Sequence, residues 1–513
     1  MKNLSRTKKA ILNAKISMVC YFIGLVTTFF TRKIFLDNLG NDFIGLTGTL
    51  QSLLGFLNLA ELGVSAAIAF VLYKPLFDSD EDKIKEIIAV LGFLYRCIGY
   101  FILGGGVILS LFLPLIFSGA KISIGVIYFG FYAYLFSSLL GYFVNYRASL
   151  LSADQKNYLV TGYYQLASSS KAIVQMAFAI YFQSFYLFLS IELIFAIVNS
   201  IILNWKINQT YPWLKLKEYN GRKLLRNYPI IGVKIRQLVI HRIGAFVQFQ
   251  IMPFFVYSYV SLPMVALYGN YSMIIQRLEG FISSLSNGLY AGVGNLIAED
   301  NKEKILWLYK ELMVSRIAIS SIIIICLYNL LSPLIIVWLG SDYELSHTFV
   351  FLLCIVSFMN LCRSTTDQFV SGYGLFGDVW APFSEAALYI MSALIMGPLY
   401  GLNGLVLSPI ISLGIVVYIW KPYWLFSRGF RIPVIRYWYC IIKYLLPVII
   451  IFIIEPLVCN HIMTVAEISS GWLPLVKGGL LYGVSSSCLI IGIMALLFGE
   501  MRSFLKRFIR KHG

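Results

Sequence analysis

The sequence is poor in charged residues: Asp, Glu, Lys and Arg make up only 13% of its 513 residues, whereas 59% are hydrophobic. Soluble globular domains carry about 25% charged residues. Apolar runs of about 20 residues, each long enough to cross ~30 Å of hydrocarbon, recur from one end of the sequence to the other. The low charge therefore excludes a soluble globular protein and predicts an all-α, polytopic membrane protein.

Motifs for ATP hydrolysis and for metal binding are also missing. The sequence has no GxxxxGK[ST] loop, in which backbone amides and a lysine hold the phosphates of ATP. Its eight cysteines show no CxxC or Cys/His spacing, and its four histidines form no cluster. We therefore expect no catalytic residue, no metal and no cofactor. A net charge of +17 would suggest a nucleic acid as partner of a soluble protein, but these cations lie in the predicted loops, so we expect no nucleic-acid partner.

Hydrophobic runs separated by short polar connections predict about fourteen membrane-spanning helices. The predicted spans are 15–36, 43–72, 90–117, 122–146, 158–182, 184–205, 237–259, 262–297, 313–339, 346–371, 382–400, 403–423, 440–459 and 474–498. Nearly all Lys and Arg residues outside these spans lie in loops on one side, and the other side holds only Lys121. Because cytoplasmic loops carry the excess of Lys and Arg, we expect both termini to be cytoplasmic.

The two halves of the sequence resemble each other. Residues 46–71 and 271–296 align without a gap, and each is the second predicted span of its half. The identical pairs are Gln51/Gln276, Leu53/Leu278, Gly55/Gly280, Phe56/Phe281, Gly63/Gly288 and Ala66/Ala291. Such a repeat predicts two six-helix lobes related by a pseudo-two-fold axis along the membrane normal, with two extra helices at the C-terminus. The predicted domains are an N-terminal lobe (1–205), a basic cytoplasmic linker (206–236), a C-terminal lobe (237–423) and a region with the last two spans and a basic tail (424–513).

Charged residues inside the predicted spans are the candidates for a binding site. A cation at the centre of a bilayer costs about 2.5–3.5 kcal/mol on insertion scales, so we expect most of them to face water or acidic partners. On several spans they share a helix face with other polar residues, as a water-filled cavity between helices requires. The candidate cavity cations are Arg32, Lys33, Lys171, Arg242, Arg277 and Arg363, and the candidate polar lining is Gln51, Asn58, Asn270 and Asn360.

Structural explanations remain open for these residues. Arg32 and Lys33 lie about one turn from the outer end of the first span and could reach the lipid headgroups. Arg363 and Asp367 are one turn apart and could form a structural ion pair, and Glu61 could be a buried neutral acid or a site for a coupling ion. In the first half, intramembrane cations outnumber acids. This excess favours an anionic cargo, and arginine in particular binds phosphate in a bidentate way.

Three stretches carry a resemblance to a known family. They are "TRKIFLDNLGNDFIGL" at the end of the first span, "ELGVSAAIAFVLYKPL" in the second and "NYRASLLSADQKNYL" after the fourth. With the plan of twice six spans plus two, they make the sequence similar over nearly its whole length to bacterial polysaccharide flippases, of the O-antigen or capsule type. These flippases belong to the multidrug/oligosaccharidyl-lipid/polysaccharide exporter superfamily.

The resemblance implies an activity and a cargo. A polyprenyl-diphosphate-linked oligosaccharide repeat unit would be flipped from the cytoplasmic to the periplasmic leaflet of the bacterial inner membrane, by alternating access of two lobes. On this resemblance Arg32 would hold the diphosphate, and Arg147 would help at the cytoplasmic mouth. The implied partners are the lipid-linked oligosaccharide, membrane lipids, and the polymerase and chain-length proteins of polysaccharide synthesis.

The source of energy and two other functions remain open. Without an ATP site, transport would be driven by a Na⁺ or H⁺ gradient, by the membrane potential or by consumption of the product outside. Glu61 and Asp367 are the candidate coupling-ion sites. One alternative is a multidrug or small-cation exporter of the same superfamily, against which the fourteen spans and the arginine bias argue. The other is an enzyme, a membrane polysaccharide polymerase or ligase, against which the short outer loops argue.

Overall fold

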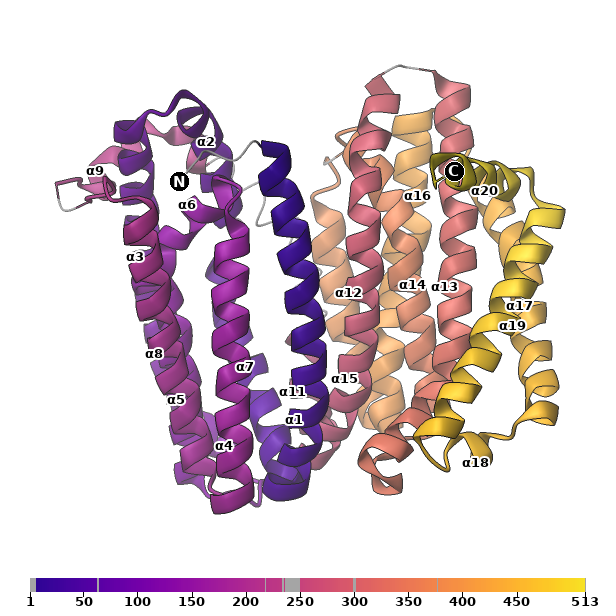
Figure 1. Ribbon diagram of the computed structural model, residues 1–513, viewed down its shortest axis with the longest axis horizontal. Helices are drawn as coiled ribbons and strands as arrows, with labels where there is room; N and C mark the ends of the chain where they lie inside the picture. The colour runs from indigo at the N-terminus through magenta and orange to yellow at the C-terminus, as the bar shows by residue number, and fades with distance from the viewer. Residues whose placement is uncertain are drawn as a thin grey trace. The chain divides into compact units, whose positions relative to one another are not determined.

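The computed structural model describes residues 6–61, 64–216, 218–232, 235, 250–298, 301–375 and 377–512, and every regular element in these residues is helical (Figure 1). The chain divides into two compact units, Met1–Ala266 and Leu267–Gly513. The boundary falls inside one long helix, α12, whose first residues belong to the first unit.

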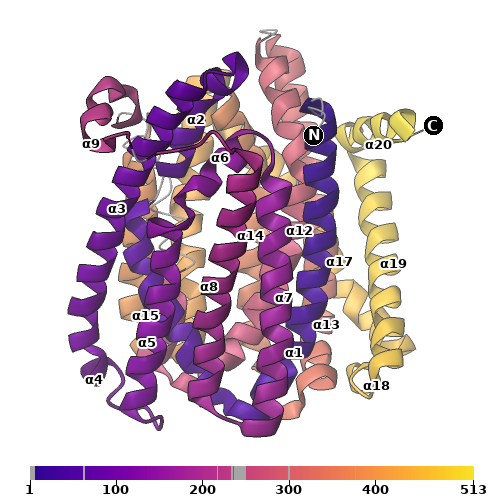
Figure 2. The same ribbon diagram turned by 60° about the vertical axis from the view of Figure 1, so that its left-hand side comes forward.

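The first unit is a bundle in which α1 packs on α7, α7 on α8, α8 on α5 and α5 on α3 (Figure 2). Its short elements lie between these long helices. The bounds are α1 (Arg6–Leu57), η1 (Asn58–Glu61), α2 (Val64–Asp78), α3 (Glu81–Leu111), α4 (Leu113–Ile116), α5 (Ile124–Phe143), η2 (Asn145–Arg147), α6 (Ala148–Ala153), α7 (Asn157–Phe182), α8 (Phe185–Thr210), α9 (Gly221–Leu224), η3 (Leu225–Asn227) and α11 (Met252–Tyr259), followed by the start of α12 (Leu262–Ala298).

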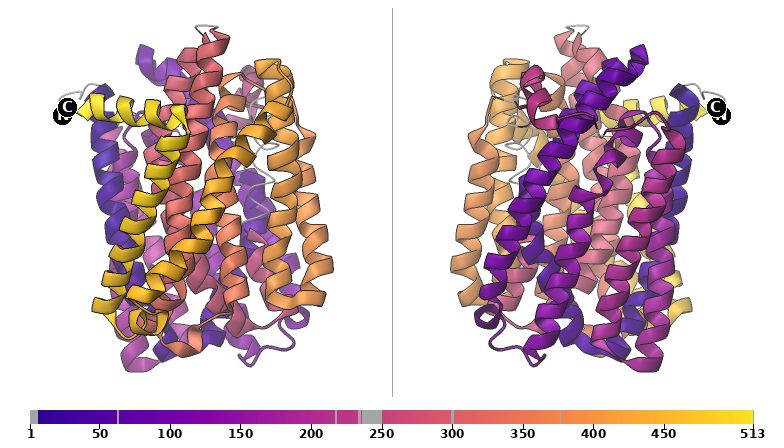
Figure 3. Two further views of the ribbon diagram at one scale, coloured as in Figure 1. Left: turned by 90° about the vertical axis from the view of Figure 1, so that its right-hand side faces the viewer. Right: turned by 90° about the vertical axis from the view of Figure 1, so that its left-hand side faces the viewer.

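The second unit is built around α13, which packs on α14, α17, α19 and α20 (Figure 3). Residues on all faces of α13 are buried, which is typical of the central helix of a bundle. The bounds are α13 (Lys302–Leu339), η4 (Ser341–Tyr343), α14 (His347–Gly372), α15 (Trp380–Ser412), η5 (Leu413–Trp420), α16 (Lys421–Trp424), η6 (Leu425–Phe430), α17 (Ile435–Ile462), α18 (Val465–Ile468), α19 (Trp472–Leu497) and α20 (Gly499–His512).

Within the described residues, nine helical stretches are long and apolar enough to cross a membrane. Two of them, Lys15–Leu57 and Trp380–Phe430, are long enough for two crossings each. In each, the backbone leaves the helical conformation at one glycine: Gly40 has φ 82° and ψ 165°, and Gly401 has φ 55° and ψ −132°. Only glycine adopts such positive φ angles without strain. Trp380–Phe430 therefore holds two of the predicted spans, and Lys15–Leu57 holds the first span and the beginning of the second.

The predicted spans agree with the observed helices, and the all-α polytopic fold is confirmed. Every predicted span falls on described helix over most of its length. The exceptions are residues 62–63 and 237–249, which lie outside the described residues, and single turn or end residues such as Phe112, Ser123 and Ile251. The second span differs in one respect. Between α1 and α2 the chain forms the 3₁₀ turn η1, so this crossing is a broken helix and not a continuous one. Long helices with such a break commonly carry binding groups in membrane transporters.

Two close contacts fix α1 within the first unit. The Asn13 side chain donates to the carbonyl of Gln155 (2.8 Å) and accepts from the amide of Tyr158 (2.7 Å). It therefore provides hydrogen-bond partners for two backbone groups at the turn between α6 and α7. At the other end, a Cβ atom at Gly45 would lie 2.0 Å from the carbonyl oxygen of Leu262. Glycine is therefore required at position 45 for α1 to approach the start of α12.

Candidate functional site

A carboxylate lies at the break in the second membrane crossing. Glu61, the last residue of η1, accepts hydrogen bonds at Oε1 from the hydroxyls of Tyr95 (2.7 Å) and Ser65 (3.1 Å). Its Oε2 accepts from the hydroxyl of Tyr142 at 3.1 Å. Tyr95 lies on α3 and Tyr142 on α5, so the carboxylate is enclosed by three helices of the first unit.

Asn58 extends this polar cluster by one turn. Its Oδ1 accepts from Ser138 (3.2 Å) and from Tyr142 (3.1 Å), and the hydroxyl oxygens of Ser65 and Tyr95 are also in contact with each other. The structure therefore brings together Asn58 and Glu61, as their shared helix face predicts, whereas Gln51 on the same predicted face is exposed. One carboxylate surrounded by neutral oxygen atoms is a donor set that suits a proton or a monovalent cation.

The cation Lys171 is paired. Its Nζ on α7 lies 2.7 Å from Oε1 of Glu192 on α8, and both side chains are about one-fifth exposed. Gln175, one turn further along α7, donates to Oε2 of the same carboxylate at 3.3 Å. Lys171 and Glu192 line a cleft of about 380 Å³ between α5, α7 and α8. The pair is a neutral unit, so Lys171 adds no net charge to this cleft.

Arg147 is held by neutral groups. Its Nη1 donates to Oδ1 of Asn208 at 2.9 Å, and its Nη2 donates to Oδ1 of Asn204 at 2.7 Å. The Asn204 amide donates in turn to Asn145, the first residue of η2. Amide oxygens orient a guanidinium without neutralising it. Arg147 is therefore a fixed positive charge at the end of α8, beside the cleft that Lys171 and Glu192 line.

A larger cleft, of about 690 Å³, lies near the same end of the first unit. Its lining combines aromatic rings with charged groups and includes Tyr73, Phe77, Asp154, Lys156, Tyr211 and Trp213. Lys156 and Asp154 form an ion pair at 2.6 Å, and Tyr211 donates to Asp154 at 2.8 Å. Burial and the neighbouring Asp154 carboxylate raise the pKa of Tyr211 above its usual range, so this hydroxyl keeps its proton. Sequence reasoning did not indicate this cleft.

Arg32 and Lys33 differ in their surroundings although they are adjacent. Arg32 is partly buried, and its Nη2 donates to the carbonyl of Ala266, near the start of α12, at 2.8 Å. Lys33 is exposed on α1. The arginine thus joins two segments of the first unit, while the lysine is in the position expected of a side chain that reaches the headgroups.

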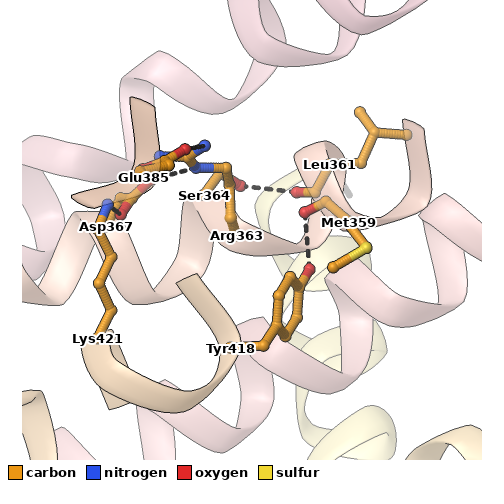
Figure 4. Close-up of polar contacts among 8 residues, drawn as sticks. All are labelled: Met359, Leu361, Arg363, Ser364, Asp367, Glu385, Tyr418 and Lys421. Atoms are coloured by element: carbon orange, nitrogen blue, oxygen red, sulfur yellow. Dashed lines mark hydrogen bonds and ion pairs between the residues drawn. The ribbon is translucent and has the colours of Figure 1, made fainter. Parts of the chain in front are cut away.

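The second unit holds an ion network of two cations and two carboxylates on three segments (Figure 4). On α14, Arg363 Nε lies 3.2 Å from Oδ2 of Asp367, so the predicted one-turn pair does form. Arg363 Nη1 lies 3.2 Å from Oε1 of Glu385 on α15, and Lys421 Nζ at the start of α16 lies 2.8 Å from Oδ1 of Asp367. The four charges cancel, which limits the cost of keeping them among apolar helices.

Three further candidates of the second unit lie among the described residues. Asn270 is buried and Arg277 is partly buried, both on α12, and Asn360 is partly buried on α14. Arg242 lies outside the described residues. The structure thus groups Asn58 with Glu61 and Arg363 with Asp367.

Two solved structures have a similar fold. The chain superposes on the lipid II flippase MurJ, in an inward closed conformation, with a TM-score of 0.64 and 15% sequence identity, over 94% of this chain and 99% of the flippase. It superposes on an inward-facing multidrug resistance MATE family transporter of the MOP superfamily with a TM-score of 0.55 and 13% identity, over 81% of this chain and 97% of the transporter. The chain shares its fold with these two transporters. No protein-family model and no curated protein sequence matches it.

The packing of the helices explains which site residues the sequence could not indicate. Lys421, near the end of the predicted span 403–423, is not among the candidate cations, but the chain continues from α15 through a π-helical stretch, η5, and the lysine side chain turns back to Asp367 on α14. Tyr95 and Tyr142 gave no signal among 34 tyrosines. Their roles depend on how α3 and α5 pack around the broken helix, which a single sequence does not specify.

Proposed function

We propose that this chain is a membrane transporter that flips polyprenyl-diphosphate-linked oligosaccharides from the cytoplasmic to the outer leaflet of the bacterial inner membrane by alternating access. The fold likeness to a lipid II flippase over 94% of the chain supports a transporter of lipid-linked cargo. The sequence stretches that resemble polysaccharide flippases support the oligosaccharide, and the distribution of Lys and Arg supports cytoplasmic termini.

The hydrogen-bond partners of Arg147 are the observation that supports a cargo with an anionic headgroup. Lys171, Arg363 and Lys421 are each matched by carboxylates, as Lys171 is by Glu192. Arg147 instead has two amide partners, Asn204 and Asn208, which fix the plane of its guanidinium and leave its charge available. A planar, fully charged fork held in place is well suited to a diphosphate, whose oxygen atoms accept two parallel hydrogen bonds.

Transport in reconstituted vesicles tests this assignment. A fluorescent polyprenyl-diphosphate oligosaccharide is supplied in the membrane, and its appearance in the other leaflet is measured by accessibility to a glycan-modifying enzyme. We expect Arg147→Gln to lower the rate at least tenfold and Arg147→Lys to restore part of it, because a bidentate arginine contact is worth more than 1.4 kcal/mol. The matched control is Arg222→Gln, which removes an exposed arginine on α9. Equal rates for Arg147→Gln and the control would show that Arg147 does not contact the cargo.

We propose coupling to a cation gradient, with Glu61 as the first candidate site. Its carboxylate has only hydroxyl partners among the described residues, so a proton or Na⁺ could bind without displacing a cationic side chain. Asp367, the second candidate, already neutralises Lys421 and Arg363. A cation at Asp367 would have to compete with both, and we therefore rank it below Glu61.

The likeness to a multidrug transporter favours a second candidate, export of small organic cations. The two functions predict opposite responses in the same vesicles. A lipid-linked diphosphate should be flipped and a lipophilic cation such as ethidium should neither be moved nor compete. Accumulation of ethidium with no flipping of the lipid would favour the exporter.

A further inference from the structure

The C-terminal helix α20 has a composition unlike that of the spanning helices. Its sequence, "GEMRSFLKRFIRKH", contains five Lys and Arg residues and one acidic residue, Glu500. It follows directly on the spanning helix α19, which ends at Leu497, and Phe498 between them has an extended backbone. Helix α20 therefore begins where α19 leaves the hydrocarbon, and it lies across the end of α19 (Figures 2 and 3).

The side chains of α20 divide into two faces. Met501 is 3% exposed and belongs to the core of the second unit, and Phe504 and Leu505 pack against the same core. Arg502 and Lys506 are exposed. The apolar face is thus occupied by the protein, and the cationic face points away from it. A helix with this division lies parallel to a membrane surface with its charges at headgroup level.

A buried carboxylate on α13 fixes the position of α20 along the axis of that helix. The Glu311 side chain on α13 is 1% exposed, and its Oε2 lies 3.1 Å from Nη2 of Arg507 and 3.4 Å from the hydroxyl of Ser503. Arg507 itself is 60% exposed. Because α13 starts at Lys302, nine residues before Glu311, it extends about 14 Å past this contact at ~1.5 Å per residue. The exposed Lys302 and Lys304 therefore lie well outside the plane of α20.

Residues from neighbouring helices continue the same surface. The ring of Trp307, on α13, lies beside Gly499 at the start of α20, and tryptophan is enriched at the membrane–water interface. On α17, Lys443 lies over the ring of Phe498, with its Nζ 5.3 Å from the ring centroid. Lys310 of α13 and Arg436 of α17 flank a small, mostly apolar recess between these helices. Clusters of Lys and Arg at the cytoplasmic ends of spanning helices attract acidic lipid headgroups.

We propose that α20, together with the adjoining ends of α13 and α17, is a docking surface for anionic phospholipid headgroups. We call this surface, formed by Lys310, Arg436, Lys443, Arg502, Lys506 and Arg507, the basic rim. Its occupant follows from charge complementarity and from continuity with α19, because the surface begins at the boundary of the hydrocarbon, where headgroups are the nearest anions. The basic rim lies on the side that the Lys and Arg distribution predicts to be cytoplasmic. The inference does not depend on the identity of the cargo.

Hydrogen–deuterium exchange of the full chain in nanodiscs tests the basic rim. We compare the exchange of α20 amides in phosphatidylcholine and in phosphatidylglycerol. We expect exchange to be slower in the anionic lipid, by on the order of tenfold for two headgroup contacts, and to rise again at 1 M salt, which screens such contacts. The double variant Arg502→Gln/Lys506→Gln should remove the difference between the lipids. The control Lys302→Gln/Lys304→Gln, with the same loss of charge, should keep it.

Two results would overturn the proposal. The first is equal exchange of α20 in both lipids for the unmodified chain. The second is a lipid-dependent difference that survives in Arg502→Gln/Lys506→Gln. Slower exchange caused by added polyglutamate in neutral nanodiscs, with no effect of phosphatidylglycerol, would assign the surface to an acidic protein and would also reject the lipid.

The variant Glu311→Gln gives a second measurement on the same helix. It removes the carboxylate that holds Arg507 and leaves the exposed cations unchanged. We expect faster exchange of α20 than in the unmodified chain in phosphatidylcholine, and slow exchange retained in phosphatidylglycerol, because the headgroups still hold the helix. Equally fast exchange in both lipids would show that Glu311 alone positions α20 and would reject the docking surface.

Discussion

Lys421 donates a hydrogen bond to Oδ1 of Asp367 at 2.8 Å, and this contact joins α16 to α14 across 54 residues of sequence. Asp367 accepts from Arg363 through its other oxygen, and Arg363 also reaches Glu385. The aspartate is thus the only one of the two carboxylates in the network that contacts both cations. Loss of its charge would leave Lys421 without an ionic partner in the network.

The network predicts a loss of stability for Asp367→Asn. Breaking a buried ion pair by removing one partner costs about 3–5 kcal/mol. Asp367 is 30% exposed and an amide would still accept a hydrogen bond, so we expect ~1–3 kcal/mol on that scale. Thermal unfolding of the purified chain in detergent measures the change. Adding Lys421→Met should recover part of the loss, because it removes the stranded ammonium group.

The matched control for this network is Asp342→Asn, which removes an exposed carboxylate in η4. We expect no measurable change in its melting temperature, since surface substitutions away from such contacts are usually within about 0.5 kcal/mol. If Asp367→Asn melts at the same temperature as this control, the network contributes nothing to stability and its role must lie elsewhere.

Glu61→Gln is predicted to uncouple transport from the driving gradient. The amide is nearly the same size as the carboxylate and can keep hydrogen bonds to Tyr95 and Tyr142, but it can bind neither a proton nor Na⁺ with comparable strength. Vesicles are loaded with either a Na⁺ gradient or a pH gradient, and the flipping rate is compared with the rate without a gradient. We expect one of the two gradients to accelerate the unmodified chain and neither to accelerate the variant.

Tyr142→Phe refines this prediction. It removes a hydroxyl that donates to both Asn58 and Glu61, so the cation should bind more weakly while coupling is retained at high ion concentration. The exposed Glu303 on α13 provides the control substitution, Glu303→Gln. If the Glu61→Gln variant keeps its full dependence on the gradient, Glu61 takes no part in coupling.

Much of the fold could be predicted because hydrophobic length dictates it. A membrane leaves few structures other than helices of about 20 residues, and charges in loops set their orientation. The pair Arg363–Asp367 could likewise be predicted, since residues four apart on a helix face the same side. Asn58 and Glu61 share a face for the same reason, and both lie in one cluster.

The partners across helices could not be predicted, because they depend on tertiary packing. The sequence shows that Lys171 and Glu192 both lie within spans, but it does not show that α7 and α8 bring them to 2.7 Å. It places Lys421 at the end of a predicted span, but it does not show that the helical chain brings the lysine back to Asp367 on α14. No proline marks the break at η1, so the sequence predicts one continuous helix for the second span.

The pair Lys171–Glu192 allows a structural role to be separated from a role in cargo binding. Lys171→Met should lower the free energy of unfolding by ~1–3 kcal/mol, because the partly buried Glu192 loses its cation. The double variant Lys171→Glu/Glu192→Lys, which swaps the two residues, should restore most of the lost free energy of unfolding. The two side chains approach each other from neighbouring helices, so the swapped pair can form the same contact. If Lys171 also contacts the cargo, the exchanged pair should be stable yet flip the lipid more slowly.

Thermal unfolding and vesicle transport of the same preparations check this prediction, with Lys121→Met, an exposed lysine beyond the membrane, as the control. An exchanged pair that is as stable and as active as the unmodified chain would show that Lys171 serves only to neutralise Glu192. An exchanged pair no more stable than Lys171→Met would show that the ion pair does not hold α7 and α8 together.

The close contact between Gly45 and Leu262 predicts that any larger residue at position 45 destabilises the chain. A Cβ at position 45 would lie 2.0 Å from a backbone carbonyl oxygen, and backbone cannot move aside as a flexible side chain can. We expect Gly45→Ala to destabilise the chain by ~1–3 kcal/mol through overpacking and to lower the melting temperature in detergent. Gly104 on α3 is the matched control, since a Cβ there meets nothing within 4 Å. Gly104→Ala should instead raise the melting temperature, because alanine is favoured over glycine in a helix by about 1 kcal/mol. Equal melting temperatures for the two variants would mean that α1 does not pack against the start of α12 as closely as this contact requires.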